Sequence, residues 1–266
     1  MKWQKVIYWQ SEVCIMDNTG TYSKILDNLT FLKSKESIAV IDETIDYVTR
    51  NNLSFIDGFL HFTEAQVEKK KINLINHSVK MAGFPKIKSL AEFDFSYQPS
   101  INKELINEFN SLRFIEKQEN IVFYGNSGVG KTHLATAIGV TAAQNRYSTY
   151  FMKCSDLIAT LHKAQLEDRL NERLKKLSGY KLLIIDELGY LPITKNDSKL
   201  FFQLIDKRYE KSSTVITTNI NFSQWDDIFG DPIIANAIID RLLHHANVVT
   251  IKGKSFRLQN LYDNDD

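Results

Sequence analysis

A glycine-rich motif in the middle of the chain has the residue types and spacing of a phosphate-binding loop. The stretch GNSGVGKT satisfies the pattern G-x-x-x-x-G-K-[ST], after an apolar run and at the start of an amphipathic one. In this pattern the backbone N–H groups of the loop surround phosphate oxygens, and the lysine reaches the β- and γ-phosphates. We therefore predict that a nucleoside triphosphate binds to Gly125, Asn126, Ser127, Gly128, Val129, Gly130, Lys131, Thr132 and His133.

Two adjacent carboxylates, Asp186 and Glu187, follow the apolar run LLII. A buried carboxylate is costly unless a cation opposes its charge, and Mg²⁺ bound to a triphosphate supplies that cation. We predict that Thr132 and Asp186 hold the metal and that Glu187 orients and deprotonates the attacking water. An acid pair about 55 residues after a phosphate loop favours hydrolysis of the nucleotide over simple binding.

Three further polar residues are weaker candidates for the same site. Asn219 follows the run STVITT, where it is expected to bond the attacking water or the γ-phosphate; an ordinary turn asparagine is the less favoured alternative. Arg241 lies among apolar residues, so it is either an ordinary partner of Asp240 or an arginine finger for a neighbouring subunit. The second interpretation is favoured because nothing else near the phosphate loop offers a guanidinium. Arg257 is a second candidate finger, equally compatible with a surface strand.

The composition is that of an ordinary globular protein, and we expect this protein to be cytoplasmic. The chain has 266 residues, 43% of them hydrophobic and 24% charged, with a net charge of +1. No run approaches the eighteen apolar residues of a membrane helix, and the first residues do not form a signal peptide. The two cysteines, Cys14 and Cys154, have no metal-type spacing.

The hydrophobic pattern divides the chain into a helical part and an alternating part. Apolar residues recur at helical spacing between Tyr22 and about Val79. Five short β-rich runs, starting at residues 120, 148, 181, 213 and 247, then alternate with helical stretches. This order predicts an α/β fold with a five-stranded parallel sheet, helices on both faces and a small all-α domain before it. We expect an N-terminal extension at 1–20, a helical domain at 21–82, a linker at 83–100 and the nucleotide-binding domain at 101–266.

Basic residues gather in two places. The segment from Glu64 to Leu90 has six lysines against two glutamates, and a second basic face accompanies the leucines at positions 166, 170, 174 and 177. Solvated helix faces commonly look like this, so the pattern permits DNA binding without requiring it. Such residues would contact the phosphate groups of DNA and would not recognise individual bases. The candidates are Lys69, Lys70, Lys71, Arg169, Arg173 and Lys176.

His244 and His245 raise the question of a metal site. Neighbouring residues on a helix point about 100° apart, so these two cannot chelate one ion without further ligands. We expect them to be histidines at the C-terminal end of a helix, where their charge favours the helix dipole.

From about Tyr22 to Leu258 the chain resembles the IstB family, the ATP-binding helpers of insertion-sequence transposases. The resemblance is carried by the motifs IIDELGYLP, SQWDDIFGDPIIANAIIDRLLHHANVV and FDFSYQPSI. It places the chain in the AAA+ initiator and helicase-loader group, alongside DnaC. It also implies ATP as the nucleotide, assembly of a homo-oligomer on duplex DNA and activation of a partner transposase of the IstA type. In this group the matching positions serve as phosphate lysine, magnesium acid, catalytic base, sensor and finger, namely Lys131, Asp186, Glu187, Asn219 and Arg241.

These features lead to one main functional hypothesis with alternatives. The main hypothesis is a Mg²⁺-dependent ATPase that binds duplex DNA with little sequence preference and recruits a transposase. The alternatives are a replicative-helicase loader of the DnaC type, a small-molecule kinase and a DNA scaffold that binds nucleotide without hydrolysis. Residues 1–20 lie outside the resemblance, and we expect that residues 1–15 can be removed without loss of ATPase activity or DNA binding.

Overall fold

The computed structural model describes residues 18–190 and 193–258. It divides into two compact units, Met1–Asn73 and Leu74–Asp266, which are described separately. The predicted N-terminal extension at 1–20 lies almost entirely outside the described residues. No helix in the described part of the chain combines the length and apolarity needed to cross a membrane.

The first unit contains α1 (Asn18–Phe31), α2 (Lys35–Arg50) and the start of α3 (Phe55–Met81), which continues into the second unit. The predicted helical region is therefore present. Val40 and Ile41 of α2 are buried, but apolar residues that recur at helical spacing along α3 are not. Ile56 is 76% exposed and Leu60 is 56% exposed. Helical spacing therefore identified α3 correctly as a helix, but its apolar residues are not buried within the described chain.

The second unit is built on the predicted five-stranded sheet, in which every paired strand is parallel and the order is β2-β3-β4-β1-β5. Parallel strands of this kind need crossover connections, which the intervening helices supply. The strands are β1 (Asn120–Gly125), β2 (Thr149–Lys153), β3 (Leu182–Leu188), β4 (Ser213–Thr218) and β5 (Ala246–Ile251).

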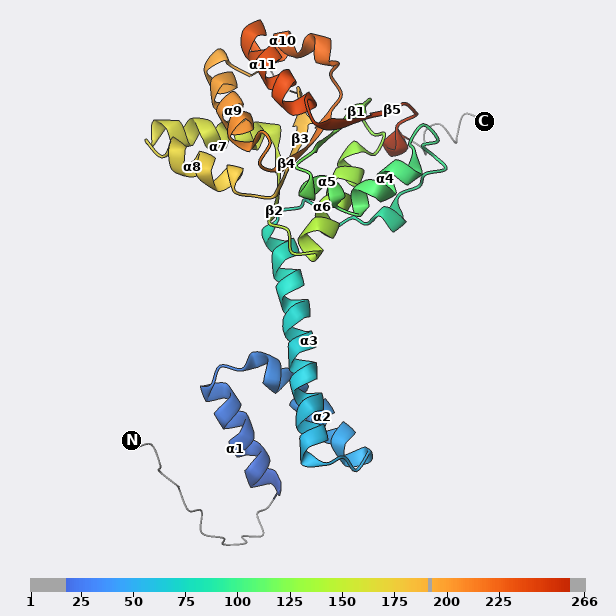
Figure 1. Cartoon of the computed structure of the whole chain (residues 1–266), viewed down its shortest axis with the longest axis vertical. Helices are drawn as coiled ribbons and strands as arrows, with labels where there is room; N and C mark the ends of the chain where they lie inside the picture. Colours follow the sequence, from blue (N-terminus) through green and yellow to red (C-terminus); the bar gives the residue numbers. More distant parts are fainter. Residues whose placement is uncertain (1–17, 191–192, 259–266) are drawn as a thin grey trace. The chain divides into compact units, whose positions relative to one another are not determined.

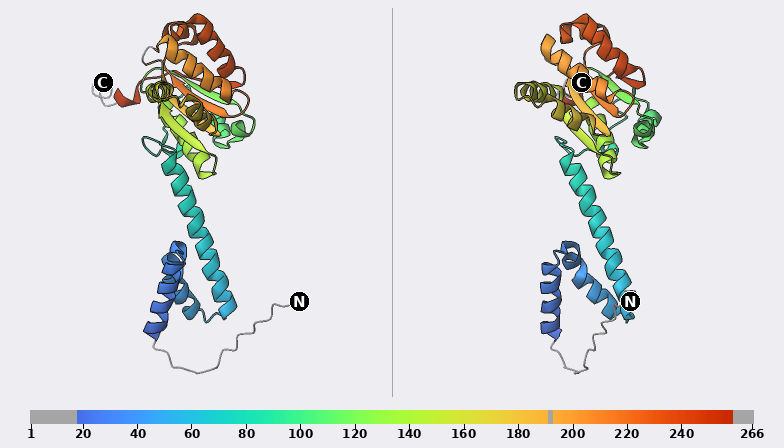
Figure 2. Two further views of the ribbon diagram at one scale, coloured as in Figure 1. Left: turned by 90° about the vertical axis from the view of Figure 1, so that its left-hand side faces the viewer. Right: turned by 60° about the vertical axis from the view of Figure 1, so that its left-hand side comes forward.

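Helices cover both faces of this sheet because successive strand residues point to opposite sides. In β3, Leu183 and Ile185 belong to the core on one face, and Leu182 and Ile184 belong to the core on the other. Figure 1 shows the two groups of helices on opposite sides of the sheet, and the views in Figure 2 keep α4 and α5 apart from α7 and α8. The first group is α4 (Lys103–Asn110), α5 (Arg113–Glu116) and α6 (Lys131–Gln144); the second is α7 (Cys154–Leu166), α8 (Leu170–Ser178), α9 (Lys195–Arg208), α10 (Trp225–Phe229) and α11 (Pro232–Leu243).

The strand order brings the two sequence motifs to the same edge of the sheet. β4 lies between β1, which ends in the phosphate loop, and β3, which carries the acid pair. Because all these strands are parallel, their carboxyl ends lie at one edge, where ligands bind in open α/β sheets.

Residues 83–100, predicted as a linker, are part of the second unit and pack against its hydrophobic core. Phe84, Phe93 and Phe95 all contact the hydrophobic core on the α6 side of the sheet. The backbone N–H of Phe151 in β2 donates to the carbonyl of Ala82 at 2.7 Å, which fastens the start of this segment to the sheet. The segment also contains a short 3₁₀ helix, Leu90–Glu92. This segment therefore contributes to the core of the second unit and to the cavity described below.

Candidate nucleotide-binding site

The phosphate loop joins the end of β1 to the start of α6, as the motif predicts. Gly128 and Gly130 adopt φ values of +80° and +100°, a region that L side chains rarely enter. Gly125 is required for space as well, since a Cβ there would lie 2.3 Å from the carbonyl oxygen of Ile251 in β5. These glycines let the loop turn tightly, so that α6 begins at Lys131 with its N-terminus at the loop.

Lys131 is 7% exposed, and its Nζ is held by the loop itself. It donates to the carbonyl oxygens of Gly125 and Asn126, each at 2.7 Å. Burial lowers the pKa of Lys131, whereas the nearby charge of Asp186 acts in the opposite direction. The ammonium is therefore positioned at the loop by backbone carbonyls, where it can exchange these partners for phosphate oxygens.

Asp186 is 2% exposed at the end of β3, and two hydroxyl groups donate to its Oδ1. Thr132 Oγ1 donates at 2.9 Å and Thr217 Oγ1 at 2.6 Å. Burial raises the pKa of Asp186, because its charge is removed from water. A buried carboxylate beside a hydroxyl is an oxygen-only set of the kind that Mg²⁺ prefers, so Thr132 and Asp186 fit the predicted metal.

Glu187 follows Asp186 but has a different backbone conformation. Its φ is +61°, and the pairing of β3 with β4 is irregular between Ile185 and Leu188. The Glu187 N–H donates to Thr217 Oγ1 at 2.9 Å, and its carboxylate pairs with Lys153 Nζ at 2.8 Å. The irregularity turns Glu187 away from the direction of regular strand pairing, and Lys153, at the end of β2, orients its carboxylate. The sequence analysis did not identify Lys153, because the parallel pairing of β2 with β3 is what brings it here.

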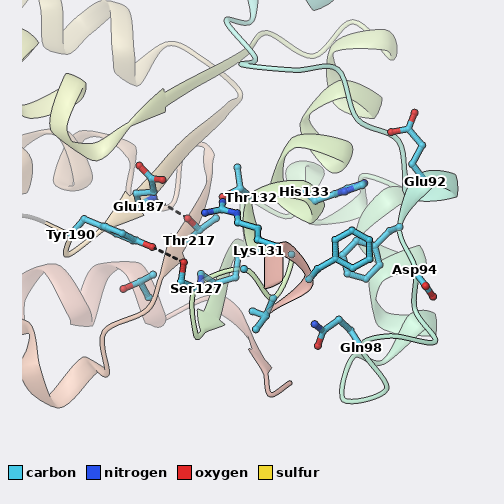
Figure 3. Close-up of a pocket in the computed structure, with 17 residues that line it drawn as sticks. Glu92, Asp94, Gln98, Ser127, Lys131, Thr132, His133, Glu187, Tyr190 and Thr217 are labelled. Atoms are coloured by element: carbon cyan, nitrogen blue, oxygen red, sulfur yellow. Dashed lines mark hydrogen bonds between the residues drawn. The ribbon is translucent and has the colours of Figure 1, made fainter. Parts of the chain in front are cut away.

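Lys131, Thr132 and Glu187 line a cavity of about 200 Å³ (Figure 3). The loop from Ser127 to His133 lines it together with Glu187, Tyr190, Thr217 and Thr218. The rest of the lining, which we call the distal wall, consists of Glu92, Phe93, Asp94, Gln98, Phe256 and Arg257. The distal wall was not predicted, since it combines the expected linker with residues after β5. Of the predicted loop residues, Gly125 and Asn126 contribute through the carbonyl oxygens that hold Lys131.

Asn219 lies directly after β4, which pairs with β3 as expected. Within the described chain Asn219 does not line the cavity, although Thr217 and Thr218 do. Its Oδ1 is buried and has no hydrogen-bond partner among the described residues. Its role as a sensor remains a prediction.

The two arginines considered as fingers lie in different surroundings. Arg241 is in α11, where its Nε donates to Asp206 Oδ1 at 2.8 Å and its guanidinium lies 4.7 Å from the centre of the Phe202 ring. Its acidic partner is thus Asp206 and not Asp240, the partner named in the alternative interpretation. Arg257 lines the cavity, and its charge helps to lower the pKa of Lys131, after the larger effect of burial. The expectation that no other guanidinium lies near the phosphate loop was therefore wrong, because the segment after β5 returns to the loop.

The basic face predicted around α8 is brought together in the second unit. Arg169, Arg173 and Lys176 line one hollow of about 240 Å³, together with Lys163 of α7, which the sequence analysis missed. Arg173 Nε is buried and has no partner in the described structure. Two glutamates oppose this charge, since Arg169 pairs with both Glu167 and Glu172.

The structure also places Leu166 and the three adjacent lysines of α3. Leu166 is 75% exposed and ends α7, so it is not part of a continuous apolar stripe with Leu174 and Leu177. The lysines at 69, 70 and 71 are exposed on α3, in the first unit, and Lys71 pairs weakly with Glu68 at 4.0 Å. Nucleic-acid contact by these residues remains a prediction.

His244 and His245 lie at and just after the end of α11, close to Glu210. Their nearest ring nitrogens are 3.8 and 3.4 Å from Glu210 Oε1, so the structure adds the third group that adjacent histidines need. However, His244 Nδ1 already has a hydrogen-bond partner in the Tyr209 hydroxyl at 2.6 Å. This contact accounts for His244 as part of a polar network between the ends of α9 and α11.

Comparison with known proteins shows the family to which the chain belongs. The sequence model of the family described as "IstB-like ATP binding protein" matches residues 28–263. The ATP-binding protein of insertion sequence IS232 from Bacillus thuringiensis subsp. berliner is 53% identical over 93% of this chain and 99% of the relative. That of IS21 from Pseudomonas aeruginosa is 46% identical, with 87% of each chain covered. A crystal structure of DnaI shares the fold, with a TM-score of 0.53, 21% identity, and coverage of 62% of this chain and 91% of that one. The chain belongs to the family of IstB-like ATP-binding proteins of insertion sequences, on an AAA+ P-loop fold.

Proposed function

We propose that this protein is a Mg²⁺-dependent ATPase that assembles on duplex DNA with little sequence preference and recruits or activates a partner transposase. The observation that carries the proposal is that four side chains lie close together at one edge of the sheet: three of them line the cavity, and the fourth, Asp186, accepts a hydrogen bond from Thr132. Lys131 and Thr132 come from the phosphate loop, and Asp186 and Glu187 come from the end of β3. The roles of these side chains follow from their chemistry, and the family to which the chain belongs points to transposition.

In the proposed hydrolysis, each side chain has a separate task. Lys131 gives up its two carbonyl partners and binds phosphate oxygens. Glu187 accepts a proton from the attacking water, with Lys153 holding its carboxylate in place. Thr132 and Asp186 would hold Mg²⁺, which when bound neutralises negative charge on the phosphates.

Arg241 is proposed to act in a neighbouring subunit. It lies outside the cavity of its own chain, where it is held by Asp206 and Phe202. Its side chain is 29% exposed, which leaves part of it accessible to a second copy. By contrast, Arg257 lines the cavity of its own chain and is proposed to contact the nucleotide there.

DNA binding is proposed for the hollow between α7 and α8. Four basic side chains surround it, and the buried Arg173 Nε lacks a partner that a phosphate oxygen could supply. Lys69, Lys70 and Lys71 are proposed as further phosphate contacts. Affinity should fall with salt by about 0.9 log units per phosphate contact for each tenfold increase in salt, and shuffled DNA sequences should bind almost equally.

The test measures ATP hydrolysis by the full chain with and without duplex DNA. We expect DNA to stimulate hydrolysis, and Arg241→Ala to bind ATP normally yet hydrolyse it about a thousandfold more slowly. Mixing Arg241→Ala with Lys131→Ala subunits should restore part of the activity. The Arg241→Ala subunit keeps Lys131 in its own site, and a Lys131→Ala neighbour supplies Arg241 to that site. Complete absence of rescue would contradict a shared site. Arg257→Ala is the matched comparison, and it should weaken ATP binding in every mixture.

A helicase loader of the DnaC type is the second candidate, because the fold is shared with DnaI. The two functions are separated by capture of partners on the immobilised, ATP-bound protein. Binding of a purified transposase of the IstA type supports the proposal. Binding of a replicative helicase, without the transposase, supports the alternative.

A further inference from the structure

The ends of α9 and α11 bring together three side chains of the types that bind transition metals. Glu210 lies just after α9, His244 caps the C-terminal end of α11, and His245 is the next residue. Each side chain offers one carboxylate oxygen or ring nitrogen, and these three atoms all lie within 4.8 Å of one another. Ligand atoms around a tetrahedral Zn²⁺ ion are about 3.3 Å apart. The three side chains therefore lie close to the spacing of a metal site.

The individual distances show that the two rings converge on one carboxylate oxygen. His245 Nε2 is 3.4 Å from Glu210 Oε1, and His244 Nδ1 is 3.8 Å from the same atom. The centres of the two rings are 4.1 Å apart. Adjacent histidines inside a helix would point about 100° apart. Because α11 ends at Leu243, His245 is not held in the helical direction, and its ring can approach that of His244.

Neighbouring contacts hold the two helix ends that carry this cluster. One helical turn before His244, Arg241 Nε donates to Asp206 Oδ1 at 2.8 Å, which ties α11 to α9. The Tyr209 hydroxyl forms a further hydrogen bond of 2.6 Å with His244 Nδ1. Figure 1 shows α9 and α11 next to each other. The backbone of the cluster is therefore in place, and only exposed side chains need to rotate for an ion to bind.

We propose that Glu210, His244 and His245 bind a divalent transition metal ion, with Zn²⁺ as the best match. Imidazole nitrogens and a carboxylate oxygen suit Zn²⁺, whereas Mg²⁺ takes oxygen ligands. Within the described chain no fourth Asp, Glu, Cys or His joins the cluster, which leaves one position of the ion for water. To ligate through Nδ1, His244 releases its hydrogen bond with Tyr209.

The proposed metal site is separate from the nucleotide cavity. None of its three residues is among the described residues that line that cavity. A bound ion would join the end of α9 to the end of α11, one helical turn from Arg241. It would thereby stabilise the part of α11 from which the proposed arginine finger projects. The metal site itself does not depend on the proposed ATPase function.

The test is calorimetric titration of Zn²⁺ into the full chain, after treatment with a chelator and without nucleotide. Excess Mg²⁺ is present throughout, because it competes for oxygen-only sites such as the one proposed at Asp186 and not for imidazole ligands. We expect one Zn²⁺ ion to bind per chain. Absence of zinc binding by the folded wild-type chain would overturn the inference. Since neither nucleotide nor DNA is used, this result is independent of the proposed function.

Variants identify the ligands. His245→Ala and Glu210→Gln each remove one ligand at an exposed position, and each should weaken zinc binding by more than about tenfold. His77→Ala, at an exposed histidine of α3, is the matched control and should bind zinc as the wild type does. Tyr209→Phe removes the hydroxyl that competes for His244 Nδ1, so it should tighten zinc binding by about threefold. Wild-type zinc affinity in His245→Ala or in Glu210→Gln would overturn the inference.

Discussion

The two ends of the nucleotide cavity differ in how the chain builds them. The phosphate end comes mainly from one continuous loop, in which glycine conformations and the start of α6 place Lys131 and Thr132. The distal wall combines the segment before α4 with the segment after β5, and Tyr97 and Ser255, which join them, are 158 residues apart. The comparison shows that local backbone conformation positions the residues proposed to bind the phosphates, whereas long-range packing positions the distal wall. Substitutions in the phosphate loop and in the distal wall should therefore weaken the binding of different parts of the nucleotide.

The largest effect is expected at the phosphate end from Glu187→Gln. Removing the proposed base should slow ATP hydrolysis by about a hundredfold to ten-thousandfold, while ATP affinity changes little. Release of inorganic phosphate and equilibrium binding of labelled ATP measure the two quantities separately. Hydrolysis at the wild-type rate would show that Glu187 is not the base.

Lys131→Ala should weaken binding of both ATP and inorganic triphosphate by about a hundredfold, because the lysine contacts only the phosphates. Competition against a fluorescent analogue of ATP measures both ligands. Lys207→Ala, at an exposed position in α9, is the control and should leave both affinities unchanged. Loss of ATP binding with normal binding of inorganic triphosphate would contradict the assigned position of Lys131.

Phe93→Ala should weaken ATP binding by about tenfold through lost contact with the part of the nucleotide beyond the phosphates, and leave inorganic triphosphate unchanged. This is the direct test of the comparison between the two ends. The ring also packs against Gly130, so an equal loss for both ligands would mean that Phe93 acts by supporting the phosphate loop. Phe93→Leu, which retains apolar contact, should give a smaller loss of ATP affinity.

The smallest effect is expected from pH. Burial raises the pKa of Asp186, so as the pH falls this carboxylate takes up a proton at a higher pH than an ordinary aspartate does. Magnesium-dependent ATP binding should decrease by less than about tenfold as the pH falls toward this raised pKa. For the protein without ligand, folding stability changes with pH in the opposite direction. The folded state binds the proton more tightly than the unfolded state, so stability should decrease as the pH rises through the same range.

Asp186→Asn is the control for both measurements, because it removes the titrating group. Its magnesium-dependent binding should be weak at every pH, without the wild-type slope. A wild-type slope that persists in Asp186→Asn would assign the pH dependence to another group.

Much of the fold could be predicted from the sequence, because its signals are local. The apolar runs of β1 and β3 and the glycines after β1 indicated strands and a phosphate loop, and each lies where predicted. The exposed Leu166 shows the limit of the same reasoning. Its spacing fits an apolar stripe, but α7 ends there and the chain turns before α8.

Parts of the site depended on contacts that spacing does not reveal. Lys153 meets Glu187 only because β2 pairs with β3, and Arg257 reaches the cavity only because the chain after β5 returns to the phosphate loop. The irregular segment at 83–100 has no hydrophobic period, which indicated a linker. Its aromatic residues were the available signal that it packs against the domain.

The sequence alone therefore determined the chemistry of the phosphate end, because a loop of glycines, a lysine and a threonine has the required conformation within eight consecutive residues. The tertiary structure alone decided what lines the rest of the cavity. Phe93, Gln98 and Arg257 are ordinary residues in irregular segments, and only the packing of those segments around the phosphate loop gives them a common cavity. The physical reason is range: dihedral preferences act between neighbours in the chain, whereas burial joins residues that are far apart in it.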